Sequence, residues 1–233
     1  YNYIFLETKY RVYFPYFIVT KFTRNYMAIT TYSELKTSVA DYLNRADLTS
    51  IIPTFIALAE AQINRDVRHW SMENRATTSF DGQYGTRPSD WVATIRMHLT
   101  GNGTKAMNLI SQQAMAEKRA NDNDTAGTPM FYAHSESQFE LYPTPDQATT
   151  AEILYYQKVP ALSDSNTTNW LLSYAPDVYL YGSLIHSAPY LAEDARTAVF
   201  AQMYGASVNQ LNEKSEESKT SGSGLKLRVR GLG

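Results

Sequence analysis

The chain has 233 residues, enough to bury the core of one large domain or of two modest ones. Its 21 Lys and Arg and 23 Asp and Glu residues give a net charge of -2, so the chain as a whole has no strong attraction to nucleic acid. The absence of cysteine excludes a disulfide scaffold, cysteine-ligated zinc and a thiol nucleophile. The 18 Tyr, 9 Phe and 3 Trp are typical of a chain with large contact surfaces.

Residues 1–26 differ in composition from the rest of the chain. They hold ten aromatic residues and neither Ala nor Gly. Their apolar stretch YFPYFIVT contains Pro15 and precedes no small-residue cleavage site, which argues against a secretory signal. We interpret Met27 as the natural start, with residues 1–26 translated from an upstream stretch. An arm lying on a neighbouring subunit is the alternative, and the intact mass of the native protein separates the two.

Residues 27–74 carry the signals of two helices. Thr31 and Glu34 have the spacing of a capping box, in which each side chain satisfies a free amide at the helix start. A second helix is expected to begin near Pro53, which the first turn of a helix tolerates. Its apolar positions recur at helical spacing: Ile52, Phe55, Ile56, Ala59, Ile63 and Val67. We expect an antiparallel helix pair, the first part of a helical bundle.

Between residues 75 and 160, short runs rich in β-branched and aromatic residues replace the helical pattern. Turn sequences separate the runs, among them Asp81-Gly82, Gly101-Asn102-Gly103 and Ser135-Glu136-Ser137. A brief helix at about 111–120 interrupts them. The pattern predicts a small, mostly antiparallel β domain inserted between two helical regions.

Helices return in residues 161–216, the second part of the expected bundle. From Val178 through Ala192 no residue is charged. This run is shorter than the roughly 20 apolar residues that a membrane span needs, and it contains glycine and proline, so no membrane segment is expected. A last helix is expected from about residue 193 to residue 213, with Ala198, Ala201, Tyr204, Val208 and Leu211 on one face.

The uncharged run presents two different faces when it is placed on a helix. One face carries Tyr181, Leu184, Ile185 and Ala188, and the nearly opposite face carries Tyr179, Ser183, His186 and Tyr190. A helix that is weakly polar all round is expected to be buried on both sides. Burial within its own subunit and contact with another subunit are the two alternatives for the second face.

The sequence predicts no catalytic, metal or cofactor site. His69, His98, His134 and His186 lie in separate predicted elements. Their spacings match no metal or catalytic motif. The stretch 121–127 has oxygen ligands at calcium-like spacing, but the bidentate Glu of such a loop and the helix after it are missing. A solvated turn explains this stretch better.

The composition of residues 217–233 predicts a flexible linker followed by a docking arm. In the arm, Leu225, Leu227 and Val229 alternate with Lys226, Arg228 and Arg230. An extended segment with this alternation has one apolar edge and one basic edge. Such a segment can add to a sheet edge or lie in a groove of another protein, with a disordered tail as the alternative.

Several stretches in this order resemble one known family. They are TYSELKTSVADYLNRADLTSIIPTFIALAEAQINRDVR at 31–68, RPSDW at 87–91, FELYPTP at 139–145 and ILYYQKVPALSDSNTTNWLLSYAPDVYLYGSLIHSAPYLAEDAR at 153–196. Together they resemble the head-to-tail adaptor, or connector, proteins of tailed bacteriophages, of the tail tubular protein A type. The resemblance covers most of 28–230.

The resemblance implies a structural virion protein without enzymatic activity or cofactor. Such adaptors form a homo-oligomeric ring, usually a dodecamer, between the portal protein and the tail nozzle protein. They line the DNA exit channel, where contact with double-stranded DNA is transient and non-specific, and they pass through the host cytoplasm during assembly. The implied α+β fold is an antiparallel helical bundle with an inserted β domain and an extended C-terminal arm.

The resemblance also assigns roles to two groups of residues. Residues 225–230 would dock on the portal, and the face with Tyr179, Ser183, His186 and Tyr190 would form the subunit interface. The alternative function is a tail-associated protein that binds the bacterial surface or hydrolyses glycans through its β domain. That function would need a carboxylate cluster or an exposed aromatic groove in residues 75–160, where the acidic residues lie mostly in predicted turns.

Overall fold

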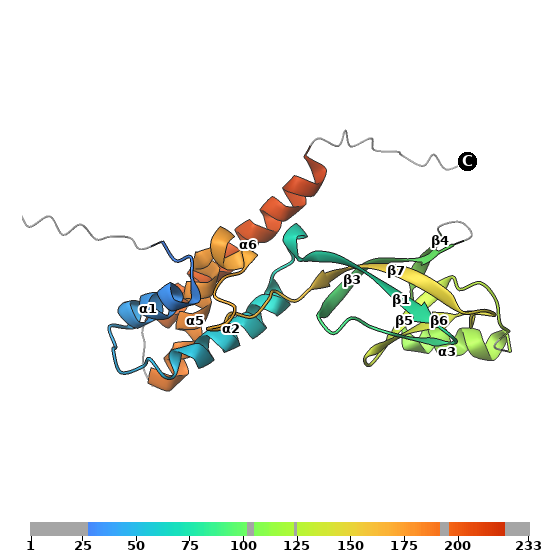
Figure 1. Ribbon diagram of the computed structural model, residues 1–233, viewed down its shortest axis with the longest axis horizontal. Helices are drawn as coiled ribbons and strands as arrows, with labels where there is room; N and C mark the ends of the chain where they lie inside the picture. The colour runs from blue at the N-terminus through green and yellow to red at the C-terminus, as the bar shows by residue number, and fades with distance from the viewer. Residues whose placement is uncertain (1–27, 102–104, 124, 192–195, 222–233) are drawn as a thin grey trace, which may run out of the picture.

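The computed structural model describes residues 28–101, 105–123, 125–191 and 196–221, and the molecule is elongated, with most helices toward one end and the strands toward the other (Figure 1). The helices are α1 (Tyr32–Leu43), α2 (Ile52–Asp66), η1 (Trp70–Met72, a 3-10 helix), α3 (Gln112–Asn121), α4 (Trp170–Tyr174), α5 (Pro176–Leu191) and α6 (Thr197–Thr220). The strands are β1 (Glu73–Phe80), β2 (Tyr84–Thr86), β3 (Trp91–Thr100), β4 (Lys105–Leu109), β5 (Phe131–Ser135), β6 (Gln138–Tyr142) and β7 (Thr149–Gln157). The predicted α+β class is confirmed.

The predicted capping box starts α1. The amide of Glu34 donates to Oγ1 of Thr31 at 3.3 Å, and the amide of Thr31 donates to Oε2 of Glu34 at 2.9 Å. Hydrogen bonds from Thr30 and Thr31 hold the pKa of the Glu34 carboxyl at about 2. The helix ends at Asn44, whose φ of 51° is left-handed, a conformation that asparagine tolerates. The local signals in the sequence therefore fix both the start and the end of α1.

The second helix also follows its sequence pattern. Pro53 lies in the first turn of α2, where its missing amide hydrogen costs nothing. All six predicted apolar positions are buried: Ile52, Phe55, Ile56, Ala59, Ile63 and Val67. None of the helices in the described part of the chain is long and apolar enough to cross a membrane.

The uncharged run forms α5, the central helix of the bundle. It packs against α1, α2, α4 and α6 of the same chain. Gly182 lies where three helices meet, because a Cβ at this position would stand 3.2 Å from Ala59 of α2 and 3.4 Å from Tyr204 of α6. A side chain at this position would make a tight contact with Ala59, so glycine favours the close approach of α5 to α2.

The last helix is longer than expected and turns a different face inward. It runs from Thr197 to Thr220, so the predicted linker start at residue 217 falls inside α6. Tyr204, Val208 and Leu211 are buried as predicted, whereas Ala198 and Ala201 are exposed. Phe200 and Ser215 are buried instead. The inner face therefore follows the large residues rather than the alanines.

The seven strands form one sheet in the order β1-β7-β3-β4-β5-β6-β2. All neighbours are antiparallel except β4 and β5, which are parallel, so the pairing is mostly antiparallel as predicted, in a sheet that is mixed at this one pair. Its ends, β1 and β2, approach each other without a ladder of hydrogen bonds. The hydroxyl of Thr78 in β1 donates to the carbonyl oxygen of Thr86 in β2 at 2.7 Å. The sheet is therefore nearly closed into a barrel.

The packing of Phe80 against Gly85 supports this closure. Phe80 ends β1 and is fully buried. A Cβ at Gly85 in β2 would stand only 2.3 Å from its ring, closer than real Cβ contacts. The missing side chain at Gly85 therefore lets the aromatic ring fill the seam between the two edge strands.

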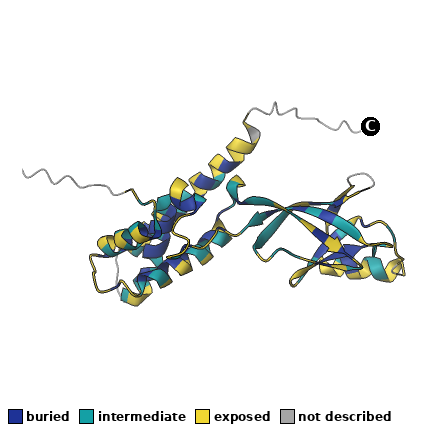
Figure 2. Ribbon diagram, viewed as in Figure 1, coloured by how far each residue is buried: buried dark blue, intermediate teal, exposed yellow. Residues whose placement is uncertain are grey.

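Helix α3 covers the outside of the barrel. Met115 packs with Ala133 and Tyr142 in a small core of its own. Beside it, the Arg119 guanidinium lies 3.1 Å from the buried carboxylate of Glu140. Two larger cores fill the bundle and the barrel interior, and the buried faces of the helices turn toward one another in Figure 2.

Candidate assembly surfaces

Two of the four residues expected at a subunit interface lie inside the subunit. Tyr179 and Ser183 are fully buried in α5. The Ser183 hydroxyl donates to the Tyr179 carbonyl at 2.8 Å, and the Tyr179 hydroxyl accepts from Nδ2 of Asn169 at 2.7 Å. Burial raises the pKa of Tyr179. The expectation is corrected for these two residues, because helices of the same chain cover that face of α5.

The other two residues lie at the rim of the bundle. Nε2 of His186 is 2.9 Å from Oε1 of Gln62 in α2, and burial together with the nearby Arg65 lowers the pKa of His186. Tyr190 is 58% exposed and packs edge to face on Phe55, with 5.7 Å between ring centroids. Both side chains therefore sit where α2 and α5 meet the surface.

An exposed leucine extends this rim along α2. Leu58 lies one turn before Gln62 on the same side of α2, and like Tyr190 it is exposed. We call Leu58, Gln62, His186 and Tyr190 the α2–α5 flank. None of these four side chains is charged, and the charged Arg65 of α2 lies close enough to His186 to lower its pKa. The exposed Tyr190 and Leu58 are of the kind that protein interfaces bury.

Helix α6 exposes a second uncharged surface. From Thr197 to Asn212 it contains no charged residue. Val199 and Met203 are nonetheless exposed, one turn apart. Isolated exposed apolar residues are ordinary, but two uncharged helix surfaces on one bundle are a feature of subunits that bury them in an assembly.

A cluster of aromatic rings, which the sequence analysis did not identify, joins the bundle to the barrel. His69 is buried, with its ring stacked on Trp170 at 5.0 Å and tilted against Trp70 at 5.3 Å and Tyr174 at 5.6 Å. Trp70 and Tyr174 are 52% and 59% exposed. We call these four residues the aromatic platform. About 100 positions of sequence separate its two halves, so no local pattern indicates it.

The buried histidine makes the stability of the fold depend on pH. Burial lowers the pKa of His69 below its ordinary value of 6.5, and the nearby charge of Lys219 lowers it further. The unfolded chain therefore binds the proton first, so this contribution to stability is complete above about pH 6.5 and is lost as the pH falls below it.

We expect His69→Phe, which keeps a ring for stacking, to flatten the pH dependence of stability. The measurement is urea unfolding at several values between about pH 7.5 and pH 5.5. Burial also lowers the pKa of His134 and His186, so part of the dependence should remain. Equal slopes for the variant and the unmodified chain would contradict the role of His69.

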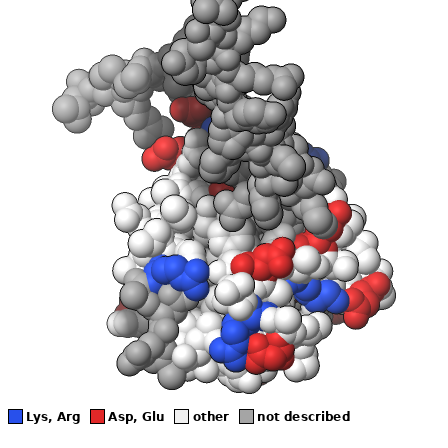
Figure 3. Space-filling model, turned by 90° about the vertical axis from the view of Figure 1, so that its left-hand side faces the viewer, with Lys and Arg blue, Asp and Glu red and all other residues white. Residues whose placement is uncertain are grey.

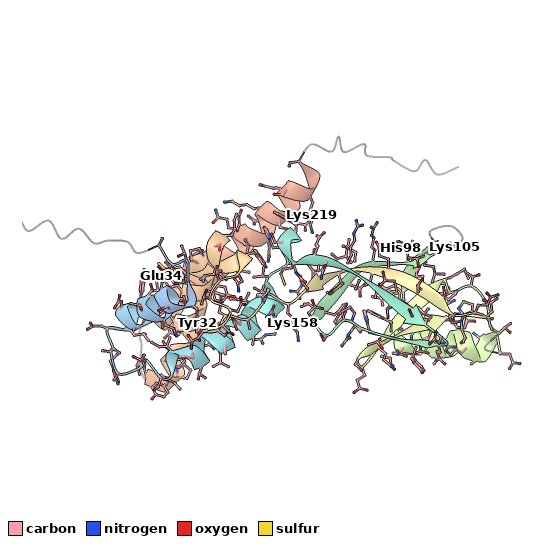
Figure 4. The ribbon with its side chains drawn as sticks, viewed as in Figure 1. Tyr32, Glu34, His98, Lys105, Lys158 and Lys219 are labelled. Carbon is pink, nitrogen blue, oxygen red and sulfur yellow. The ribbon has the colours of Figure 1, made fainter. Side chains whose placement is uncertain are left out.

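Charges on the described surface are mixed in sign. On the outer face of the barrel, Arg75 in β1 and Arg96 in β3 stand on either side of Leu154 in β7. Glu152 lies 3.9 Å from Arg96 and 3.8 Å from His98, which Figure 4 shows on this face. At the helical end, Figure 3 shows positive and negative side chains interspersed among uncharged ones.

Two acidic residues of the barrel region, Glu140 and Asp122, have structural contacts. Glu140 is buried and accepts a hydrogen bond from Gln83 at 2.6 Å in addition to its pairing with Arg119. Asp122, in the stretch with calcium-like spacing, accepts a hydrogen bond from the Tyr142 hydroxyl. Within the described ranges, no group of three or more His, Asp or Glu side chains is arranged to hold a metal ion.

The predicted docking arm, Leu225 to Arg230, lies outside the described residues, as do residues 1–27. The last described residue is Ser221, whose amide donates to the carbonyl oxygen of Glu217 at 2.7 Å and so continues the hydrogen bonding of α6. In the sequence, residues 222–224 separate the arm from the end of this helix.

Comparison with protein families finds a match to the SU10 adaptor protein family over residues 30–228. No curated protein matches the chain. Because the family match covers most of the chain, the chain belongs to the SU10 adaptor protein family, a family of phage head-to-tail adaptors and not of enzymes. The resemblance noted from the sequence is thereby confirmed, and a role as a virion adaptor follows.

Proposed function

We propose that this adaptor forms a ring, a dodecamer, that joins the portal protein to the tail nozzle protein at the head-tail junction of the virion. The family match over residues 30–228 carries this proposal. The elongated subunit and its uncharged helix surfaces support it, because a ring of such subunits buries those surfaces and leaves both ends of each subunit for different partners.

The ring interface in this proposal uses the α2–α5 flank. A closed ring needs a head-to-tail contact, in which two different surfaces of the subunit meet. The flank supplies one uncharged surface, centred on Leu58 and Tyr190, and the exposed part of α6 around Met203 supplies another. His186 takes part at the rim, whereas Tyr179 and Ser183 support the flank from inside the subunit.

We expect Tyr190→Glu to prevent ring formation while leaving the subunit folded. Glutamate at the centre of an uncharged contact removes an aromatic ring and buries a charge, which weakens each contact by about 2 kcal/mol, roughly thirtyfold. Sedimentation velocity of the protein, alone and with portal rings, measures the loss. Tyr84→Glu is the matched control, because this tyrosine is similarly exposed but lies on the barrel. Unchanged assembly of Tyr190→Glu would contradict the proposed interface.

The portal contact in this proposal is made by the C-terminal arm. Its apolar edge, Leu225, Leu227 and Val229, would lie against the portal, with backbone hydrogen bonds adding affinity. Its basic edge, Lys226, Arg228 and Arg230, would pair with acidic groups there. The arm follows the end of α6 in the sequence after a short Gly/Ser stretch, and such a tether gives it the reach to a neighbouring protein.

Contact with DNA in the proposed channel is transient and independent of base sequence. A conduit must let DNA slide, so a strongly basic wall would hold the duplex too tightly. The mixed charges on the barrel, where Glu152 lies 3.9 Å from Arg96, are consistent with this requirement. Assembly would take place in the host cytoplasm, before the completed particle leaves the cell.

A further inference from the structure

The aromatic platform combines a buried centre with two exposed rings. The ring of His69 stacks on Trp170, which packs against the bundle core, and it is tilted against the rings of Trp70 and Tyr174. Two large rings are thus fixed in place with about half of each exposed. Exposed tryptophan and tyrosine held in this way are the side chains that contribute most to protein contacts.

The platform lies beside the end of α6. The amide of Trp70 donates to Oγ of Ser215 at 2.9 Å, which ties η1 to the helix. One turn further on, the ammonium of Lys219 lies 2.8 Å from Glu73 and 2.9 Å from the Tyr156 hydroxyl. Figure 4 shows Lys219 at this junction. Ser221 lies six residues beyond Ser215, so the chain after it starts about 9 Å along the helix from the contact with Trp70.

The length of the remaining chain is sufficient to reach the two exposed rings. Twelve residues follow Ser221, and an extended chain spans about 3.3 Å per residue, or roughly 40 Å in all. The glycines at 222 and 224 permit the chain to reverse direction after the helix. The same subunit can therefore supply the segment that covers its own platform.

The chemistry of this segment fits the surface on two counts. Leucine and valine side chains pack on aromatic rings, and arginine stacks on them through its guanidinium group. Contacts between a cation and an aromatic ring already occur near the platform. Lys219 and Arg68 lie 5.4 and 6.0 Å from the centre of the Tyr156 ring. A shallow depression on α6 is lined by Asn212, Glu213, Glu216 and Glu217. Glu216 pairs with Lys219 at 3.1 Å, and the three carboxylates have the sign that complements the basic edge of the arm.

We propose that residues 222–233 dock on the aromatic platform of their own subunit, with the arm's aliphatic and basic side chains against Trp70 and Tyr174. The contact goes beyond the adaptor role and does not depend on it. In the free subunit it keeps the apolar edge of the arm covered, and a partner that binds the arm must displace it from the platform.

Acrylamide quenching of tryptophan fluorescence tests this contact. We expect deletion of residues 222–233 to raise the Stern–Volmer constant, because the deletion uncovers Trp70. The same deletion in a Trp70→Phe chain should leave the constant unchanged, which assigns the effect to this residue rather than to Trp91 or Trp170. Replacing Arg228 and Arg230 by Ala in the full chain should give part of the rise without removing the segment.

Three results would overturn the proposal. Equal quenching of the full and shortened chains would mean that the segment does not cover Trp70. A rise caused by deleting residues 1–27, and not by deleting 222–233, would identify the other end of the chain as the occupant. A difference that disappears on dilution would place the arm of a neighbouring copy on the platform. Portal binding is measured separately, so failure here leaves the adaptor function intact.

Discussion

Tyr179→Ala is expected to lower the free energy of unfolding by about 3–5 kcal/mol, the range for large aromatic residues removed from a core. The ring of Tyr179 is fully buried among the helices of its own subunit. Its loss leaves a cavity in the bundle core, and it also removes the oxygen that accepts a hydrogen bond from Asn169. Urea unfolding followed by circular dichroism measures the change.

Tyr190→Ala is the matched control for this prediction. It removes the same side chain from the same helix, but at a position that is mostly exposed, so the loss should stay below about 1 kcal/mol. Substitution of Tyr179 should therefore lower the stability of the subunit, whereas substitution of Tyr190 should weaken assembly. If the Tyr179→Ala subunit is as stable as the unmodified chain but fails to assemble, Tyr179 contributes to the subunit interface and the prediction is wrong.

Gly85→Ala is expected to destabilise the barrel by about 1–3 kcal/mol, the usual cost of overpacking a filled core. The added methyl group would stand 2.3 Å from Cε1 of Phe80, so either the fully buried ring or strand β2 must shift to accommodate it. The loss should therefore be larger than for an alanine placed at an open glycine.

Gly82→Ala provides that comparison. No atom lies within 4 Å of a Cβ at Gly82, which is in the preceding turn, so this variant should be nearly neutral. Adding Phe80→Leu to Gly85→Ala should recover part of the stability, because the smaller side chain relieves the contact. If the two alanine variants unfold at the same urea concentration, the seam is not closed by this packing.

The sequence indicates the local elements well because their signals are local. The capping pair of Thr31 and Glu34 and the buried stripe of α2 follow from residues a few positions apart. The turn at Ser135-Glu136-Ser137 was also indicated by its position between two strand-like runs. In the structure it joins β5 to β6, and Glu136 has a left-handed φ of 48°. Each of these features depends on the chain within one or two turns of itself.

Features that depend on distant contacts could not be derived in the same way. A helical wheel does not say which face of α5 its own subunit covers. Tyr179 and Ser183, expected at the subunit interface, are fully buried, whereas Tyr181, Ile185 and Ala188 of the opposite face are only partly buried. The aromatic platform requires His69 to meet Trp170 across the bundle. The closure of the barrel likewise depends on Phe80 meeting a glycine in another strand.

Electron microscopy of the purified protein mixed with portal rings from the same particle tests the central claim most directly. If the chain is the adaptor between portal and tail, the portal rings should carry a collar of this protein, and deletion of residues 222–233 should remove the collar. A full-length chain that stays monomeric and never decorates the portal would contradict the proposed function.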